Sequence, residues 1–393
     1  MRSILHIVAS MDPQGGGVCQ AVKDIITGLE QQEISSEVLC FDLPDAQFLK
    51  GASFPIHALG PTQSPYAYSP KLKVWLSEHM MHYEVLIIHG LWLYNTYGTY
   101  RIWNQFKKKE IPAMPRLYIM PHGMLDPYFQ KAPDRRLKAL RNSVFWRLFE
   151  RKAINGADGL LFTCEEELLL ARKTFSSYHP RAELNVGLGT SPPPPFETDF
   201  EDAFYKAVPK LDNKPFLLFL SRIHPKKGVD LLIGAYLQIL NRNPEVPDLV
   251  VAGPGLESDY GCAMLELGKH PKIHFPGMLT GPKKWGAFYG CEAFILPSHQ
   301  ENFGIVVAEA LACGRPVLIS NKINIWREVE AGEGGLVFQD SLECTLKALT
   351  RFLTLNSIKT EELGKHASDT FLKHFEITQA AKTMITKLGL DNG

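Results

Sequence analysis

One stretch of the sequence, residues 293–320, constrains the fold more than any other. It opens with a short apolar run at 293–296, which is typical of a buried strand, and closes with a second apolar run at 317–320. Between them, residues 305–313 contain no proline or glycine and are rich in alanine, leucine and glutamate, which favour a helix. The order strand, loop, helix, strand predicts one repeat of a parallel sheet. The loop then lies at the carboxyl end of the first strand, where such sheets bind ligands.

Two carboxylates stand eight residues apart in this stretch. Glu301 lies in the loop, and Glu309 lies inside the predicted helix among small and apolar neighbours. A carboxylate in apolar surroundings needs partners, and sugar hydroxyls suit it because an ionised carboxylate accepts two donors at once. The free N–H groups at the helix start favour an anion such as phosphate. On this spacing alone, a solvated helix with an unremarkable glutamate remains the alternative.

The rest of the chain repeats the alternation of short apolar runs and helical segments. Four consecutive prolines at 192–195 resist both helix and sheet and mark a boundary between two halves. The apolar runs predict strands at 4–9, 36–41, 85–88, 115–120, 159–164 and 184–189 in the first half, and at 215–220, 248–252, 272–275, 293–296 and 317–320 in the second. The predicted fold class is therefore α/β, with one domain at 1–190 and another at 197–369.

Composition excludes several classes of protein. The 393 residues include 42 Lys and Arg and 42 Asp and Glu, so the net charge of zero predicts no nucleic-acid partner. No apolar run approaches the roughly 18 residues that a transmembrane helix needs. The seven cysteines are scattered and lie mostly in apolar surroundings, which indicates reduced thiols and predicts a cytoplasmic location.

A second group of charged residues follows the predicted strand at 215–220. Arg222 and Lys227 flank a turn that leads into a helix predicted for 229–240. Two cations at a helix start oppose the helix dipole, so an anion between them would relieve the repulsion. A leaving diphosphate is the natural candidate, and a solvated basic turn is the alternative.

The first half offers a glycine turn and two histidines at strand ends. Gly16 and Gly17 follow the first strand, where residues without side chains let backbone N–H groups approach an anion. The segment is not G-x-G-x-x-G, which counts against a dinucleotide site. His89 and His122 each follow a buried strand and precede a glycine. One such histidine is usually structural, but two at equivalent strand ends indicate a functional role.

Residues 131–152 combine many cations with aromatic side chains. At helical spacing, Phe145, Trp146 and Phe149 form an apolar stripe with the cations on the opposite face. An ordinary solvated helix is the simpler interpretation. The alternative is contact with anionic lipid headgroups or with a lipid-linked diphosphate acceptor at the inner face of a membrane.

The pair Glu301 and Glu309, with Asn-Phe-Gly inside it and Gly-x-Pro-Val after it, resembles the donor-binding signature of retaining glycosyltransferases of family 4. That family has the GT-B fold, so the resemblance implies two Rossmann-like domains whose parallel sheets face each other across a cleft. It also implies that the C-terminal segment at about 370–393, with a last helix at 370–388, crosses back to the first domain. The segment His-Gly-Met-Leu-Asp-Pro resembles bacterial exopolysaccharide and envelope-polysaccharide enzymes of the family, including the cyanobacterial heterocyst-envelope type.

The resemblance assigns roles to residues of this chain. In the family the second glutamate holds the ribose of a nucleotide-sugar and the first holds the sugar, and these roles fall on Glu309 and Glu301. The catalytic residues that it implies are His122, Glu301, Arg222 and Lys227. The donor-binding residues are Gly16, Gly17, Arg222, Lys227, Gly253, Met278, Leu279, Glu301, Asn302, Phe303, Gly304, Ile305 and Glu309. The candidates on the acceptor side are His89, Trp92 and Asp126.

The predicted reaction is a metal-independent transfer of a hexose from UDP-glucose, with retention, to a saccharide or lipid-linked saccharide in polysaccharide synthesis. The sequence contains no Asp-x-Asp pair, which a metal-dependent transferase would use. We therefore predict no metal and no cofactor besides the nucleotide-sugar substrate. A nucleotide-sugar 2-epimerase of the same fold and a non-catalytic carbohydrate-binding protein are the alternatives. An NAD-dependent oxidoreductase is disfavoured because neither half carries G-x-G-x-x-G.

Overall fold

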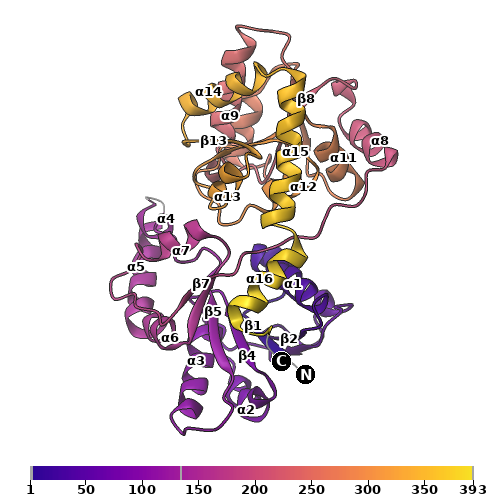
Figure 1. Ribbon diagram of the computed structural model, residues 1–393. Helices are drawn as coiled ribbons and strands as arrows, with labels where there is room; N and C mark the ends of the chain where they lie inside the picture. Colours follow the sequence, from indigo (N-terminus) through magenta and orange to yellow (C-terminus); the bar gives the residue numbers. More distant parts are fainter. Residues whose placement is uncertain (1–2, 133–134, 392–393) are drawn as a thin grey trace. The chain divides into compact units, whose positions relative to one another are not determined.

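The computed structural model describes residues 3–132 and 135–391 of the chain. The chain divides into two compact units, which Figure 1 shows as ribbons. Unit 1 comprises residues 1–189 and 377–393, and unit 2 comprises residues 190–376. The outer ends of the predicted segments, residues 1–2 and 392–393, lie outside the described residues, as do residues 133–134 of the predicted basic helix.

Unit 1 is built on a parallel sheet with the strand order β3-β2-β1-β4-β5-β6-β7. The strands are β1 (Ser3–Val8), β2 (Ser35–Cys40), β3 (Ile56–Ala58), β4 (Val85–His89), β5 (Arg116–Met120), β6 (Gly159–Phe162) and β7 (Glu183–Asn185). Successive side chains of a strand point to opposite faces, so Leu5 and Ile7 join one apolar cluster and Val8 joins another. Burial on both faces explains why the central strands are nearly continuous apolar runs.

Unit 1 has helices between its strands and a last helix, α16, that follows unit 2 in the sequence. They are α1 (Gly17–Glu30), α2 (Lys71–His79), α3 (Tyr94–Lys107), α4 (Tyr128–Lys131), α5 (Arg136–Phe145), the π-helical turn η5 (Trp146–Glu150), α6 (Arg151–Gly156), α7 (Glu165–Ala171) and α16 (Ile377–Leu388). The short 3₁₀ turns are η1 (Pro13–Gly15), η2 (Gln47–Leu49) and η3 (Met80–His82). No helix in the described ranges 3–132 and 135–391 has the length and apolar character that would let it cross a bilayer.

Unit 2 repeats the same plan with the strand order β10-β9-β8-β11-β12-β13, again with parallel strands. The strands are β8 (Phe216–Leu220), β9 (Asp248–Ala252), β10 (Ile273–Gly277), β11 (Ala293–Leu296), β12 (Val317–Ser320) and β13 (Gly335–Phe338). The helices are α8 (Thr198–Ala207), α9 (Val229–Leu240), α10 (Asp259–Leu267), α11 (Pro282–Gly290), α12 (Ile305–Ala312), α13 (Trp326–Ala331), α14 (Leu342–Leu353) and α15 (Ser357–His374), with 3₁₀ turns η6 (Pro209–Leu211) and η7 (Pro225–Lys227). The predicted α/β class with two Rossmann-like parallel sheets is confirmed.

The end of the chain forms two helices, so the single last helix predicted at 370–388 is wrong. α15 ends at His374 and α16 begins at Ile377. The break lies where Glu376 pairs with Thr190 as an isolated parallel bridge, and Thr190 N–H donates to Phe375 O at 2.9 Å. This bridge occupies backbone groups that a continuous helix would need. The sequence around 375 contains no proline or glycine that would indicate a break in the helix.

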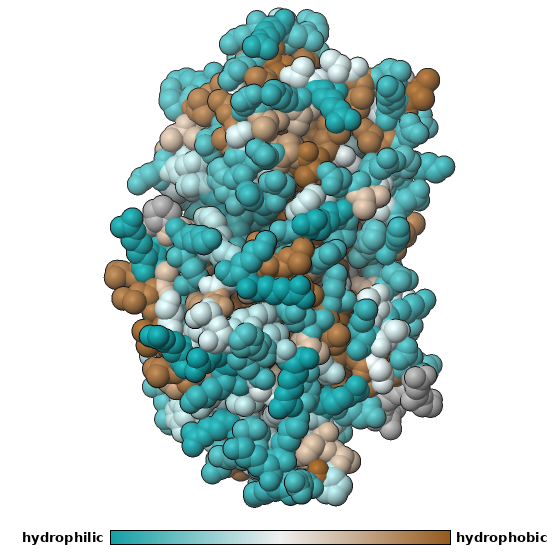
Figure 2. Space-filling model, turned by 60° about the vertical axis from the view of Figure 1, so that its left-hand side comes forward, coloured by the Kyte–Doolittle hydropathy of each residue, from teal (hydrophilic) through white to brown (hydrophobic). Residues whose placement is uncertain are grey.

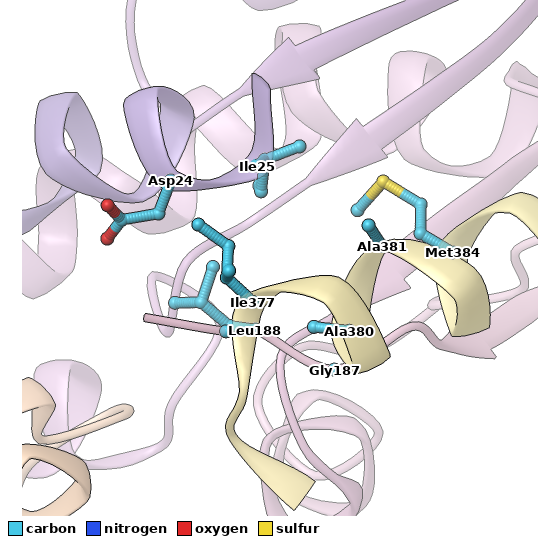
Figure 3. Close-up of a pocket in the computed structure, with 9 residues that line it drawn as sticks. Asp24, Ile25, Gly187, Leu188, Ile377, Ala380, Ala381 and Met384 are labelled. Atoms are coloured by element: carbon cyan, nitrogen blue, oxygen red, sulfur yellow. The ribbon is translucent and has the colours of Figure 1, made fainter. Parts of the chain in front are cut away.

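Helix α16 packs against α1 inside unit 1. The fit is close because a Cβ on Gly28 would lie 2.8 Å from the carbonyl oxygen of Ile377. Figure 3 shows the small cavity left beside this contact, lined by residues of α1, α16 and the segment 187–189. Its volume of about 10 Å³ holds one water at most, so it is a packing gap rather than a ligand site.

Candidate active site

The charged residues of unit 2 follow two neighbouring strands. β8 and β11 are adjacent at the point where the strand order of the sheet reverses. The turn after β8 carries Arg222 and Lys227, and the loop after β11 carries Glu301. In doubly wound sheets such a reversal opens a crevice at the carboxyl ends of the strands, where ligands bind. The topology therefore brings two groups of charges that are far apart in the sequence to one edge of the sheet.

Lys227 and Glu301 form an ion pair in which Lys227 Nζ donates to Glu301 Oε2. The lysine is buried, whereas 24% of the glutamate side chain is exposed. Lys227 ends the turn η7, which starts where the His224 ring accepts a hydrogen bond from Lys226 N–H at 3.1 Å. A buried ammonium group beside a partly exposed carboxylate leaves the pair accessible from one side.

Gly228 allows the two loops to approach this closely. Its φ of +66° lies in the left-handed region, and a Cβ here would lie 2.1 Å from the carbonyl oxygen of Pro297. The loops are also joined by a hydrogen bond of 2.8 Å from His299 N–H to Lys226 O. Backbone contacts between the two loops thus fix the relative positions of Lys227 and Glu301.

The electrostatics of this edge favour an anion. Burial and the positive charges of Lys226 and Arg222 lower the pKa of Lys227 to about 7. The carboxylate of Glu301 acts in the opposite direction because it stabilises the ammonium form. A bound anion would add a second counter-charge to the cations, as a phosphate group does in charge-assisted hydrogen bonds.

The turn that carries Arg222 rests on the end of β9. The arginine side chain is exposed, and the next residue, Ile223, donates its N–H to Pro254 O at 2.8 Å. A Cβ on Gly253 would lie 1.8 Å from Ser221 O, so only glycine fits at the end of β9. Gly253 therefore has a packing role near Arg222, in addition to the donor-binding role that we predicted for it.

Glu309 also has a basic partner. Its Oε1 accepts a hydrogen bond of 2.7 Å from Lys284 Nζ on α11. The glutamate side chain is 13% exposed. Each of the two predicted donor-binding carboxylates is thus paired with a lysine, Glu301 with Lys227 and Glu309 with Lys284.

The residues between the two glutamates have structural contacts of their own. Phe303 is buried and packs edge-on against Phe375, with ring centroids 5.6 Å apart. Gly304 adopts a φ of +74° at the N-cap of α12, and Ile305 is the first residue of that helix. The left-handed glycine turns the loop into the helix and leaves the N–H groups of the first turn free of side-chain caps.

Three further predicted donor contacts lie on loops of unit 2. Met278 is 66% exposed and its neighbour Leu279 is buried, just after β10. The Asn302 side chain accepts a hydrogen bond of 3.2 Å from Asn324. These positions are compatible with ligand contacts, and their roles stay predictions.

In unit 1, Gly16 and Gly17 lie at the start of α1. Gly16 has a φ of +113°, and a Cβ on either glycine would meet no atom within 4 Å. Both residues are exposed. Packing therefore does not require glycine here, whereas the φ of Gly16 is one that residues with a side chain rarely adopt. The approach of a ligand to this backbone stays a prediction.

Three histidines form a chain across the sheet of unit 1. His6 Nδ1 lies 2.9 Å from His89 Nε2, and His89 Nδ1 lies 2.9 Å from His122 Nε2. His6 and His89 are buried, while part of His122 is exposed. Both ring nitrogens of His89 are used inside the protein, so His89 has none left for the acceptor that we predicted it to contact.

Acidification should destabilise unit 1 through these histidines. Burial lowers the pKa of His6 to about 3 and that of His122 to about 4, and it lowers the pKa of His89 well below the ordinary 6.5. The unfolded chain therefore binds more protons than the folded one between about pH 4 and 6.5. The stability is complete above this window and should be lost as the pH falls through it, by up to about 1.4 kcal/mol per pH unit for each histidine.

One buried carboxyl group acts against this trend. Burial raises the pKa of Glu150 to about 8. Its contribution to the stability of the fold is therefore present at low pH and is lost as the pH rises through that value. One such group does not outweigh three histidines, so urea unfolding should show a net loss of stability on going from pH 7 to 5. The variant His6→Leu should reduce the slope. A stability that is constant or that rises on acidification would contradict the neutral state of the histidines.

The turn at His122 is braced from within unit 1. His122 has a φ of +52°, a strained conformation for a residue with a side chain. The buried carboxylate of Glu167 accepts hydrogen bonds from Gly123 N–H and from Thr163 N–H and its hydroxyl. This brace holds the strained turn and thereby fixes where the His122 ring points.

The two other acceptor-side candidates also have internal contacts. Trp92 has a φ of +75°, donates its N–H to Glu150 Oε1 at 3.1 Å, and packs its ring against Phe175. Asp126 is buried and accepts a hydrogen bond of 2.8 Å from Tyr128 N–H at the start of α4. Neither contact requires a ligand, and their acceptor roles stay predictions.

The sequence analysis missed Lys284, His6 and Glu167. Lys284 lies in a segment that the sequence predicts only to be a helix. Glu167 lies in a run of acidic residues, which is typical of the first turn of a helix. His6 was a single polar residue inside the first predicted strand, and that interruption of an apolar run was the one available signal. Among the described residues 3–132 and 135–391, no three His, Cys, Asp or Glu side chains form a group that could hold a metal.

The chain resembles known proteins in two ways. Residues 201–370 match the family described as glycosyl transferases group 1. A D-inositol 3-phosphate glycosyltransferase of Kribbella flavida is 30% identical over 200 residues, which cover 48% of this chain and 46% of that protein. An uncharacterized glycosyltransferase of Methanocaldococcus jannaschii is 34% identical over 119 residues, 30% of each chain. The matched part thus spans less than half the length of these relatives.

Solved structures match the whole chain at low identity. HepE of Anabaena in complex with UDP has a TM-score of 0.71 at 18% identity, covering 99% of this chain and 100% of that one. Sucrose-phosphate synthase of Thermosynechococcus elongatus has a TM-score of 0.69 at 17% identity, covering 99% of both chains. These likenesses concern the fold alone, and the family match lies within unit 2. The residues that match the glycosyl transferases group 1 family, 201–370, include the paired lysines and glutamates.

Proposed function

We propose that the protein transfers a hexose from UDP-glucose to a saccharide acceptor, with retention and without a divalent metal. The observation that carries this proposal is the pair of Lys227 and Glu301 at the strand-order reversal of unit 2, with Arg222 close enough to act on the lysine. Cations suit a diphosphate, and carboxylates suit hydroxyl groups. Solved complexes of HepE with UDP-glucose, and with UDP and glucose, support this choice of donor.

In the proposed reaction an acceptor hydroxyl oxygen bonds to C1 of the sugar on the face that the leaving group departs from. The bond from C1 to the diphosphate oxygen breaks, and its electron pair stays on the diphosphate. The leaving diphosphate takes the proton of the attacking hydroxyl, so no side-chain nucleophile is needed. Arg222 and Lys227 stabilise the charge that develops, an effect worth about 10²–10³ in rate for one such donor.

The other parts of the site have matching tasks in this proposal. Glu301 holds the sugar hydroxyls and Glu309 holds the ribose hydroxyls, while the start of α12 binds phosphate. In unit 1 we assign the glycine turn at Gly16 and Gly17 to phosphate binding and His122 to the donor sugar. No cofactor besides the nucleotide-sugar is required, and the acceptor is a saccharide or a lipid-linked saccharide in polysaccharide assembly.

A screen of nucleotide-sugars by thermal unfolding tests the donor. UDP-glucose at 100 times its Kd should stabilise the folded chain by about 2.7 kcal/mol. UDP release with saccharide acceptors then tests transfer. A new nucleotide-sugar formed without any acceptor would identify the epimerase alternative, and stabilisation by no nucleotide-sugar would contradict the proposed function.

A second part of the proposal is that α5 and η5 touch an anionic membrane surface. Phe145 and Phe149 pack against Tyr66, and Trp146 packs against Phe175, so the predicted aromatic stripe lies inside unit 1. A different apolar row is exposed at helical spacing, namely Leu137 (85%), Leu140 (65%), Val144 (46%) and Leu148 (52%).

Cations flank this exposed row, including Arg136, Lys138, Arg141, Arg147 and Lys152. Figure 2 shows brown side chains at the left-hand edge of the molecule, at the height that α5 has in Figure 1, among teal ones. Apolar side chains framed by cations match the boundary between acyl chains and anionic headgroups. Each lysine or arginine near such a surface contributes about 1 kcal/mol.

Sedimentation with phosphatidylglycerol vesicles tests this surface. The double variant Leu137→Glu/Leu140→Glu should lose vesicle binding, and binding of the wild type should weaken with salt because the charges are screened. Ile358→Glu is the matched control, since Ile358 is an exposed residue of unit 2. Equal binding by the double variant and the control would contradict the membrane contact.

A further inference from the structure

We propose that His6 and His89 are positioning residues that fix the tautomer of His122, so that His122 presents Nδ1–H outward as a hydrogen-bond donor. The inference rests on the proposed function only in taking His122 to face the substrate. The inference itself concerns the position of one proton on each ring, which does not depend on any substrate.

The sheet of unit 1 places the three rings in a diagonal row. His89 is in register with Val8 on β1 and with Met120 on β5. His6 therefore lies two residues before the level of His89, and His122 lies two residues after it. Steps of two residues within a strand keep side chains on one face of a sheet, which places His6 and His89 on the same face. His122 lies beyond the end of β5, and its contact with His89 makes it the third ring of the row. The row rises from the middle of β1 to the carboxyl edge of β5, where ligands bind in such sheets.

Contacts between the rings confirm this row. The nitrogen–nitrogen distances are 2.9 Å for both pairs, which is within hydrogen-bond range. The ring centroids are 5.2 Å apart in both pairs, with interplanar angles of 27° and 28°. The same geometry at both steps makes the chain continuous, so the tautomer of one ring dictates that of the next.

Only two arrangements of protons satisfy both hydrogen bonds when the three rings are neutral. In the first, His6 Nδ1–H donates to His89, and His89 Nδ1–H donates to His122 Nε2. In the second, every bond is reversed, and His6 carries its proton on Nε2. A neutral imidazole has one donor and one acceptor, so no mixed arrangement makes both bonds.

The buried end of the chain favours the first arrangement. His6 is fully buried, and its Nε2 has no hydrogen-bond partner among the described residues. A buried N–H without a partner is costlier and rarer than a buried acceptor without one. His6 Nε2 is therefore the unprotonated nitrogen, and the proton of each ring lies on Nδ1.

This arrangement defines what His122 offers to a substrate. Its Nε2 accepts from His89, so the free nitrogen is Nδ1, which carries the proton. Burial lowers the pKa of the ring to about 4, so the ring is neutral near pH 7. His122 then donates a hydrogen bond to an oxygen of the donor sugar and does not act as a base.

Nitrogen-15 spectroscopy on the full-length chain with labelled histidine tests the tautomer directly. Long-range proton–nitrogen correlations near pH 7 should show a protonated, pyrrole-like Nδ1 and an unprotonated, pyridine-like Nε2 for His6, His89 and His122. Single His→Asn variants assign the signals. A pyridine-like Nδ1 on His122, or a positively charged ring, would overturn the proposal.

Two variants of His6, at the buried end of the row of histidines, test the positioning role. His6→Asp puts an acceptor where the donor to His89 was, so His89 and His122 should change tautomer and kcat should fall about 10-fold or more, with the KM for the donor little changed. His6→Asn is the matched variant, because its amide keeps an N–H near the position of Nδ1, and it should restore most of the activity.

The outcomes separate the two hypotheses. Equal activity or equal loss in His6→Asp and His6→Asn, at similar urea midpoints, would reduce His6 to a packing residue and overturn the proposal. If the wild type transfers no sugar, the proposed function is wrong, while the nitrogen-15 signals still decide the tautomer of His122.

Discussion

Replacing Lys227 by methionine should lower the rate of glycosyl transfer by about 10²–10³-fold. The ammonium group is buried and already paired with Glu301, so the protein holds it in place before any ligand binds. Charge on a leaving diphosphate would meet a preorganised cation there. Methionine fills a similar volume without the charge, and the neighbouring backbone stays anchored by the hydrogen bond from His299 to Lys226.

Steady-state rates of UDP release measure this effect, with thermal unfolding as the check on folding. Lys269→Met is the matched control, because Lys269 is an exposed lysine of the same unit and its ion-pair partner Glu266 is an exposed residue three positions away. The control should keep its activity. Near-normal turnover of Lys227→Met in a folded protein would remove the lysine from the catalytic site.

Glu301→Gln should also lower the rate of glycosyl transfer by about 10²–10³-fold, while UDP alone still binds. The amide has the shape of the carboxylate but carries no charge and accepts fewer hydrogen bonds. The expected loss therefore concerns the sugar and not the nucleotide. Calorimetric titration with UDP should give an affinity within a few fold of the wild type.

Glu309→Gln is the natural comparison for this variant. Glu309 is assigned to the ribose, so this substitution should weaken binding of UDP itself. The same two measurements on both variants distinguish the roles. Weaker UDP binding in Glu301→Gln with normal binding in Glu309→Gln would show that the roles of the two glutamates are reversed.

The regular part of the fold could be predicted because each strand is a local apolar run. Strands such as β8 and β11 are buried on both faces, and parallel sheets force this composition on them. The strand–loop–helix unit at 293–320 appears as predicted, with α12 starting at Ile305. Glu301 and Lys227 could also be singled out, because they lie in loops after two predicted strands. The structure brings them together as an ion pair, and their roles toward a ligand stay predictions.

Other features depend on contacts between distant segments and leave no local signal. Lys284 matters because α11 brings it to Glu309, and nothing near Lys284 in the sequence indicates that partner. The histidine chain needs the register of β1, β4 and β5, which a single sequence does not specify. The break between α15 and α16 depends on a bridge between Glu376 and Thr190, which lies 186 residues earlier.

The central claim is that side chains of unit 2, without a divalent cation, bind a nucleotide-sugar. Calorimetric titration of the wild type with UDP-glucose, in EDTA and again in excess Mg²⁺, tests it most directly. We expect saturable binding in EDTA with an affinity that Mg²⁺ leaves unchanged within a few fold, and loss of that binding in Lys227→Met. Binding that appears only when Mg²⁺ is present would contradict the account.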